Sequence, residues 1–282
     1  MNRNILILMV LLIVSCKKES TVDSTTNLKL SSVKLIDFFF NDTSESIGVY
    51  QNNQLKSVQL RRKSGVLDGD IEINKDSEKI EAKYLYTNDP FYNDGRIWMK
   101  NSTVNRIKNT GNTTWGKLFN DNHFYYNNHK EIDSILTYKN EVELSGLFYN
   151  FTYNNGNLIS FTEKRLNFEG NLFDQFEINI GYEEGDIDNR NINTSILNYH
   201  ILKNRGLFST PDLVSRILYF NESIDGLKSK QLLKTLTVKN LESGHIEINN
   251  KINYTKDIQG RISSMIILQD NKNSNQIILT YR

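Results

Sequence analysis

The sequence predicts an all-β fold: a single antiparallel meander sheet, curved or partly closed like a half-barrel, with one or two short helices near residues 193–220. Three observations predict it. Short segments alternate apolar and polar side chains with a period of two, as half-buried strands do. Turn sequences rich in Asn and Gly separate these segments. The chain has 14 Tyr, 14 Phe and only 2 Pro, a composition that favours strands.

Residues 1–15 predict a lipoprotein signal peptide. Arg3 gives the start a positive charge, and Ile5 to Val14 is an unbroken apolar run. At about 1.5 Å per residue this run covers about half of a ~30 Å hydrocarbon core, so it fits a secretory signal and not a spanning helix. The run ends in Ile13-Val14-Ser15-Cys16, which resembles a bacterial lipobox. The resemblance implies acylation of Cys16 and cleavage before it; an ordinary signal peptide is the alternative.

Residues 16–32 predict a polar, lipidated tether between the membrane and the folded domain, because they offer little to bury. Lys17-Lys18-Glu19 also resembles a short signal that sends Bacteroidetes-type lipoproteins to the cell surface, and a generic charged linker is the alternative. We therefore expect a lipid-anchored protein of the outer membrane, on its periplasmic face or at the cell surface. The expected partners therefore include the membrane, to which the N-terminal lipid would attach the protein.

The charge balance argues against a nucleic-acid partner. Lys and Arg number 34 and Asp and Glu 33, which gives a net charge of +1. A nucleic-acid surface needs an excess of basic side chains on one face.

Residues 33–282 predict one β-meander domain. Alternation is clearest in Ile80–Tyr86, Phe176–Tyr182, Ile246–Ile248 and Ile277–Tyr281. The expected turns are Asn52-Asn53, Asp68-Gly69-Asp70, Asn93-Asp94-Gly95, Asn127-Asn128, Asn154-Asn155-Gly156 and Asp257-Ile258-Gln259-Gly260.

A short phrase recurs after four of these turns: an aliphatic residue, any residue, Ser, then an apolar residue. Its copies begin at Leu55, Ile132, Leu158 and Ile262, and the tyrosines Tyr50, Tyr126, Tyr153 and Tyr254 precede the turns. The unit is a strand, a tight turn and a strand. Because the copies are spaced irregularly, the sequence predicts a meander of hairpins and not a solenoid of fixed period.

Residues 193–220 interrupt the β pattern. Ile196, Leu197 and Ile201 have helical spacing, and Gly206 follows as a plausible C-terminal residue. Thr210-Pro211-Asp212 then offers an N-cap, a proline at the first helical position and an early acid. We expect these helices to pack on the sheet or to plug it.

The second half of the chain resembles a family. From about residue 127 onward it has Tyr-Asn-Asn-Gly turns, a helical insert and a final Tyr254-Thr255-Lys256-Asp257-Ile258-Gln259-Gly260-Arg261-Ile262. These features are similar to uncharacterised Bacteroidetes-type β-meander lipoproteins, whose hairpins carry a Tyr-Asp-x-x-Gly-x-Ile phrase. Asn154 and Thr255 stand where the aspartate of that phrase would be. The resemblance implies fold and location and brings no activity with it.

Motifs for catalysis or metal binding are weak, so we expect no enzyme, no metal and no cofactor. The sequence has no Gly-x-Ser-x-Gly elbow, and its only thiol is Cys16. Its four histidines lack the spacing of helical metal ligands. The acidic stretch from Glu183 to Asp188 is better interpreted as a solvated loop than as a calcium site.

Aromatic residues between 98 and 126 are the most informative binding candidates. Trp98, Trp115 and Tyr125 could stack on sugar rings, although a β core also needs large rings. We therefore expect a non-catalytic binding or scaffold module for a glycan or an envelope protein. One alternative is a half-barrel carrier of an apolar or lipid ligand. The other is an envelope glycan hydrolase with two facing carboxyl groups.

Overall fold

A computed structural model gives the fold of the chain. It describes residues 30–37, 42–52, 54–62, 67–76, 78–86, 92–100, 103–113, 116–140, 142–167, 169–184 and 231–281.

Sixteen strands make up the described structure. They are β1 (Leu30–Asp37), β2 (Asp42–Gln51), β3 (Gln54–Arg62), β4 (Leu67–Lys75), β5 (Lys79–Tyr86), β6 (Tyr92–Lys100), β7 (Thr103–Thr113), β8 (Gly116–Tyr126), β9 (Ile132–Tyr138), β10 (Leu144–Asn154), β11 (Asn157–Leu166), β12 (Leu172–Tyr182), β13 (Leu233–Asn240), β14 (Ile246–Lys256), β15 (Ile262–Gln269) and β16 (Lys272–Tyr281).

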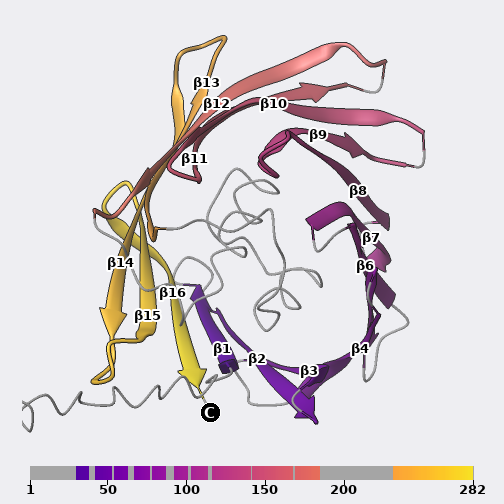
Figure 1. Ribbon diagram of the computed structural model, residues 1–282, viewed down its shortest axis with the longest axis vertical. Coiled ribbons are helices and arrows are strands. Elements are labelled where there is room, and N and C mark those ends of the chain that lie inside the picture. Colours follow the sequence, from indigo (N-terminus) through magenta and orange to yellow (C-terminus); the bar gives the residue numbers. More distant parts are fainter. Residues whose placement is uncertain are drawn as a thin grey trace, which may run out of the picture.

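The strands form a closed antiparallel barrel. Each strand pairs with its neighbours in sequence, and β1 pairs with β16 to close the ring, with Val33 opposite Leu279 and Leu35 opposite Ile277. Figure 1 shows the strands arranged around this ring. The prediction of a half-barrel that is only partly closed is therefore wrong. Closure satisfies the backbone groups that an open meander would leave exposed on its first and last strands.

The predicted helices near 193–220 lie outside the described residues. The residues that the structure describes consist of strands and turns, so the predicted open meander sheet is corrected to a closed barrel of strands. In the described part of the chain, no helix is long and apolar enough to cross a membrane. The expected insert follows β12 and precedes β13, and these two strands pair with each other up to Tyr182 and Leu233.

Alternation gives the barrel an apolar inner wall and a polar outer wall. Successive side chains of a strand face opposite sides, and in this single chain the set that is mostly shielded from solvent is the inner one. In β14, Asn250 and Ile252 are buried whereas Glu247 and Lys251 are exposed. The fully buried inner side chains include Ile71, Ile80, Ile97, Ile107, Ile135, Phe161, Phe176 and Ile178.

The two ends of the barrel differ in chemistry. We call the end where β1 begins and β16 ends the chain-end rim, and the opposite end the far rim. Toward the far rim the inner wall becomes polar and buries Asn109, Asn122, Glu163, Asn250 and Asn275. Asn122 accepts a hydrogen bond from the Thr137 hydroxyl at 2.7 Å. Apolar side chains therefore predominate near the chain-end rim, where Asn157 is a buried exception, and buried amides are concentrated toward the far rim.

A belt of tyrosines runs along the chain-end rim. Each is one of the last three residues of an even-numbered strand, and its hydroxyl donates to a backbone carbonyl at the start of the preceding strand. The pairs are Tyr50–Leu30 (2.8 Å), Tyr126–Val104 (2.5 Å), Tyr153–Ile132 (3.1 Å), Tyr182–Leu158 (2.8 Å), Tyr254–Leu233 (2.6 Å) and Tyr281–Ile262 (2.9 Å). The predicted strand–turn–strand unit is thus confirmed, and this tyrosine belt joins each unit to the strand before it.

Two predicted turns are strands instead. Asp68-Gly69-Asp70 lies in β4 and Asn93-Asp94-Gly95 lies in β6, where Gly69 pairs with Leu60 and Gly95 with Ala82. Pairing on both sides overrides the local preference of Asn, Asp and Gly for turns. The predicted turn at Asn154-Asn155-Gly156 is confirmed, with positive φ at Asn155 and Gly156.

Candidate functional site

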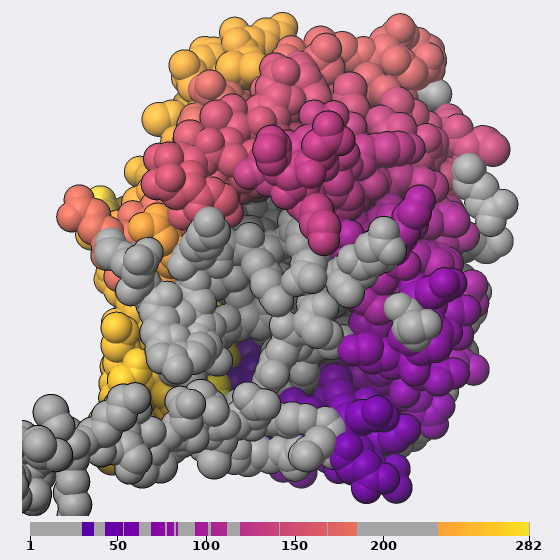
Figure 2. Space-filling model, in the orientation of Figure 1, coloured from indigo at the N-terminus to yellow at the C-terminus, as the bar shows by residue number. Residues whose placement is uncertain are grey.

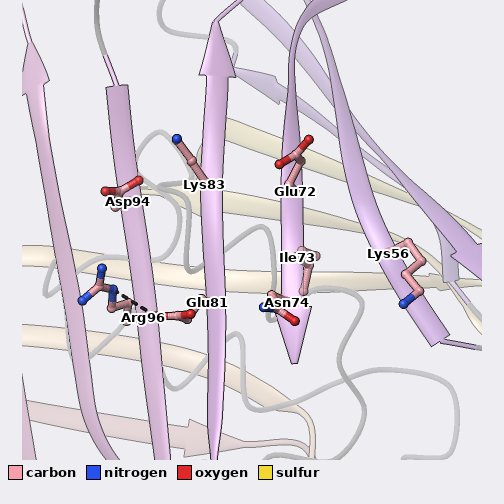
Figure 3. A pocket seen from close by; sticks show the side chains of 8 residues that line it. All are labelled: Lys56, Glu72, Ile73, Asn74, Glu81, Lys83, Asp94 and Arg96. Carbon is pink, nitrogen blue, oxygen red and sulfur yellow. Dashed lines mark ion pairs between the residues drawn. The ribbon is translucent and has the colours of Figure 1, made fainter. Parts of the chain in front are cut away.

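A concavity on the outer wall crosses strands β3 to β6. Its volume is about 580 Å³, and its lining consists of Lys56, Glu72, Ile73, Asn74, Glu81, Lys83, Asp94 and Arg96 (Figure 3). These strands are hydrogen-bonded neighbours, so short stretches of sequence that lie far apart along the chain meet on one surface.

Charges alternate across this concavity. Glu72 lies opposite Lys83, and Lys83 lies opposite Asp94 on the next strand. One row further, Glu81 lies opposite Arg96. Three cations and three carboxylates therefore share the lining, and the concavity offers hydrogen-bond donors and acceptors with no net charge.

Glu81 is the most constrained acid of the concavity. Its Oε1 lies 3.0 Å from Lys79 Nζ and 3.4 Å from Arg96 Nε. Figure 3 shows the Arg96 contact. All three side chains are at least one-third exposed, so these pairs contribute little to stability and serve mainly to orient the groups.

A second polar cluster adjoins the concavity on β6, β7 and β8. The Arg106 guanidinium lies 4.8 Å from the centre of the Trp98 ring. Its Nε and Nη2 donate to the two carboxylate oxygens of Asp121 at 2.9 and 2.6 Å. His123 Nε2 lies 3.2 Å from Asp121 Oδ1. Asp121 therefore holds the cation that covers one face of Trp98.

Asp121 remains a carboxylate despite its burial. The residue is only 2% exposed. Burial alone would raise its pKa, but the hydrogen bonds and charge of Arg106, with smaller contributions from His123 and Lys108, hold the pKa of Asp121 below its ordinary value.

Two of the three predicted stacking residues share the outer wall. Trp98 is half-buried on β6, and Tyr125 is 47% exposed on β8. Strand β7 lies between them, and Arg106 on β7 pairs with Trp98 on one side and with His123 on the other. Trp115 lies outside the described residues. Cys16 lies outside them as well, so its lipidation stays a prediction.

The histidines and the acidic stretch are only partly described, because His200 and residues 185–188 lie outside the described ranges. No group of three or more His, Cys, Asp or Glu side chains there is arranged to hold a metal ion. His129 lies in the turn after β8, away from the Asp121 cluster that contains His123. Of the acidic stretch from Glu183 to Asp188, only Glu183 and Glu184 belong to the described structure.

Sequence reasoning missed the concavity. The signal was the polar side of the alternating strands, where Glu81 and Lys83 face outward from β5. That pattern identified a solvated strand face, but it did not reveal that Glu72 and Asp94 lie beside Lys83.

Comparisons with known proteins bear on the fold. No protein-family model and no curated protein matches the chain. The chain is similar to the crystal structure of a porin-like protein from Bacteroides uniformis, with a TM-score of 0.57 and 10% identity over 90% of this chain and 98% of that one. A porin-like protein from Bacteroides vulgatus gives the same values. At this identity the likeness shows the barrel fold alone.

Proposed function

We propose that the chain is a non-catalytic envelope lipoprotein, a lipid-anchored barrel that stands in water beside a bilayer and binds a neutral glycan on its outer wall. The observation that carries this proposal is the polarity of the wall, which is charged outside and apolar inside.

The outer wall is unsuited to face lipid. A membrane-spanning barrel presents an apolar band about 25 Å tall to lipid and keeps its interior polar. Here β5 and β6 turn Glu81, Lys83 and Arg96 outward and bury Ile80 and Ile97 inside. A charged side chain on the lipid face costs up to about 2–4 kcal/mol at the bilayer midplane. This pattern supports a barrel in water.

Attachment to the membrane is assigned to Cys16. A single acyl chain binds only reversibly, and stable anchoring takes two signals, a condition that a doubly or triply acylated cysteine meets. The 14 residue-to-residue steps from Cys16 to Leu30 can span at most about 50 Å when extended. The chain enters the barrel at β1, so this tether reaches the chain-end rim.

The glycan assignment rests on the concavity and on aromatic residues of the same outer wall. Glycans are recognised by convergent hydrogen-bond donors and acceptors, together with flat rings that meet their apolar faces. The concavity supplies the polar groups without net charge, and Trp98 and Tyr125 supply rings on the same outer wall. A balanced lining fits a neutral ligand better than a polyanion.

A glycan array probed with the purified protein tests the binding site. We expect binding of neutral glycans by the wild type, and at least tenfold weaker binding by Trp98→Ala, Tyr125→Ala and Glu81→Gln. Lys251→Gln, an exposed outer-wall change on β14, serves as the control and should bind normally. Normal binding by the first three variants would exclude this site.

Hydrolysis is the competing outcome of the same experiment. The concavity brings three acids onto neighbouring strands, and a glycosidase needs two carboxyl groups about 5–10 Å apart. Release of reducing sugar from a bound glycan, lost in Glu72→Gln or Asp94→Asn, would replace the non-catalytic assignment with that of a hydrolase.

Metabolic labelling with palmitate tests the anchor. We expect label on the full chain and none on Cys16→Ala. A chain in which a cleavable secretory signal replaces residues 1–16 should stay in the supernatant without detergent. If that chain needed detergent to remain in solution, the proposal of a barrel in water would be wrong.

A further inference from the structure

An arc of exposed apolar side chains occupies one part of the far rim. It lies at the turns β9–β10, β11–β12 and β13–β14. We call it the apolar arc, and its members are Val142, Leu172, Phe173, Leu241 and Ile246, which are 85, 56, 66, 42 and 51% exposed. Soluble monomers rarely expose several large apolar side chains together unless the patch is used.

These three hairpins are neighbours in space. Strand β10 pairs with β11, and β12 pairs with β13. The Leu241 amide donates to the Gln175 carbonyl at 2.8 Å, which ties the β13–β14 turn to β12. In Figure 1 the three turns lie at the top and the upper right of the ring, and Figure 2 shows this region of the surface in pink to orange.

The wall beneath the apolar arc is held by side-chain contacts. Gln175 Nε2 donates to the Tyr149 hydroxyl at 2.6 Å, and the Lys164 ammonium lies 5.1 Å from the centre of the Tyr149 ring. These contacts join β10, β11 and β12 on the outer side, just below Phe173. The apolar arc therefore rests on a braced surface, which lowers the entropy cost of binding.

The charges at these turns are mainly negative. Their described residues carry the carboxylates Glu143, Glu169 and Glu242 and one ammonium, Lys139, whose Nζ lies 2.9 Å from Glu143. Lys164 and Lys239 lie on the strands below, so it is the tips of the turns that would repel an anionic bilayer. A second copy of the chain, docked rim to rim, would place the same carboxylates against one another.

We propose that the apolar arc docks a second envelope protein, one whose surface has an apolar patch bordered by Lys or Arg side chains. Aromatic residues are enriched in the cores of interfaces, and a charged border sets the choice of partner. The far rim is the end opposite the entry of the N-terminal segment, so this surface is presented on the other side of the barrel from the tether. The inference does not depend on glycan binding.

Site-specific photo-crosslinking in the native host tests the docking surface. A benzophenone amino acid replaces Phe173 in the full chain, and in a matched control it replaces Val49 on the outer wall near the chain-end rim. We expect one defined adduct from position 173 and none from position 49. The captured protein is then purified and its affinity for the barrel is measured.

The affinity measurement decides the proposal. Phe173→Ser with Leu241→Ser should weaken binding at least tenfold, Glu169→Lys with Glu242→Lys should also weaken it, and Val49→Ser should not. Thermal unfolding of each variant verifies its fold. No adduct, or unchanged affinity, would overturn the proposal. Flotation with phosphatidylglycerol vesicles, or a dimer lost in Phe173→Ser, would overturn it in favour of a lipid surface or a second copy.

Discussion

Arg106 donates two hydrogen bonds to the Asp121 carboxylate in a bidentate pair. This pair gives the most specific prediction of how a single substitution changes stability. Arg106→Met leaves a nearly buried carboxylate without that partner. Because the Arg106 side chain is about one-third exposed, water can replace part of the hydrogen bonding that Asp121 loses. We expect a cost of about 2 kcal/mol in the free energy of unfolding, measured in urea at pH 7.

A matched variant separates this pair from ordinary surface charge. Arg96→Met removes the cation of an exposed pair, in which Glu81 lies 3.4 Å away. Its cost should stay below about 1 kcal/mol. Equal losses in the two variants would contradict the special role of Arg106.

The same pair predicts a dependence on pH. The pKa of Asp121 is lowered in the folded state, so the stabilisation by its charge is complete above the pKa of the unfolded chain, which is about 3.9. It is lost as pH falls through the folded pKa. The difference in the free energy of unfolding between wild type and Arg106→Met should therefore become smaller below about pH 4. Urea unfolding at pH 3 would detect this.

The tyrosine belt is the feature of the strands that a substitution can test most directly. A Tyr→Phe change keeps the ring but leaves a backbone carbonyl without its donor. We expect Tyr126→Phe, Tyr182→Phe and Tyr254→Phe each to cost about 1 kcal/mol in urea unfolding. Tyr125→Phe, on the exposed side of β8, should cost almost nothing.

The belt also predicts an alkaline limit to stability. Burial raises the pKa of Tyr126, Tyr182 and Tyr254 above the ordinary value, and raises that of Tyr281 to about 12. Folding therefore keeps these phenols protonated, and the stabilisation falls as pH rises above about 10, where the unfolded phenols ionise. Absorbance at 295 nm should show exposed tyrosines titrating first and the belt titrating only as the barrel unfolds.

The hairpin turn between β10 and β11 gives a prediction for a backbone position. Gly156 has a φ of 77° and follows Asn155 at 52°. Gly156→Ala should cost about 1–2 kcal/mol, because the left-handed conformation is unfavourable for a residue with a Cβ. Gly156→Asn should cost less, since Asn tolerates this region. Thermal unfolding of the two variants checks the order.

The strands could be predicted because their signal is local. The alternation at Phe176–Tyr182 and the Asn155-Gly156 turn need only neighbouring residues, and both are confirmed. The strands through Gly69 and Gly95 were missed, because pairing with distant residues overrode their turn-like sequence. The concavity was missed for the same reason: the approach of Glu72, Lys83 and Asp94 depends on the register of three strands.

Closure is a property of the whole molecule and has no local signature. The pairing of β1 with β16 joins residues almost a chain length apart, and the sequences of these two strands do not differ in kind from those of the other strands. What the sequence does contain is an alternation that can accommodate closure: Val33, Leu35, Ile277 and Leu279 are buried on one side, whereas the other side mixes polar and apolar side chains. An open sheet and a closed barrel share that pattern.

A disulfide across the closing strands tests this arrangement. Lys34 lies opposite Ile278, and both face outward because their neighbours Leu35 and Ile277 are buried. Opposed residues of antiparallel strands have Cβ atoms about 4.5–5.5 Å apart, which small shifts bring within disulfide range. Lys34→Cys with Ile278→Cys should oxidise almost completely in a chain whose signal and Cys16 are replaced by a cleavable signal.

The control moves one cysteine a strand further. Ser264 on β15 lies opposite Ile278, so it is two strands from Lys34, about 10 Å away at the usual strand spacing. Lys34→Cys with Ser264→Cys should stay reduced under the same conditions. A non-reducing gel distinguishes the internally closed chain, which runs faster, from the open one. A half-open sheet would leave both pairs reduced, because only a closed ring brings the first strand against the last.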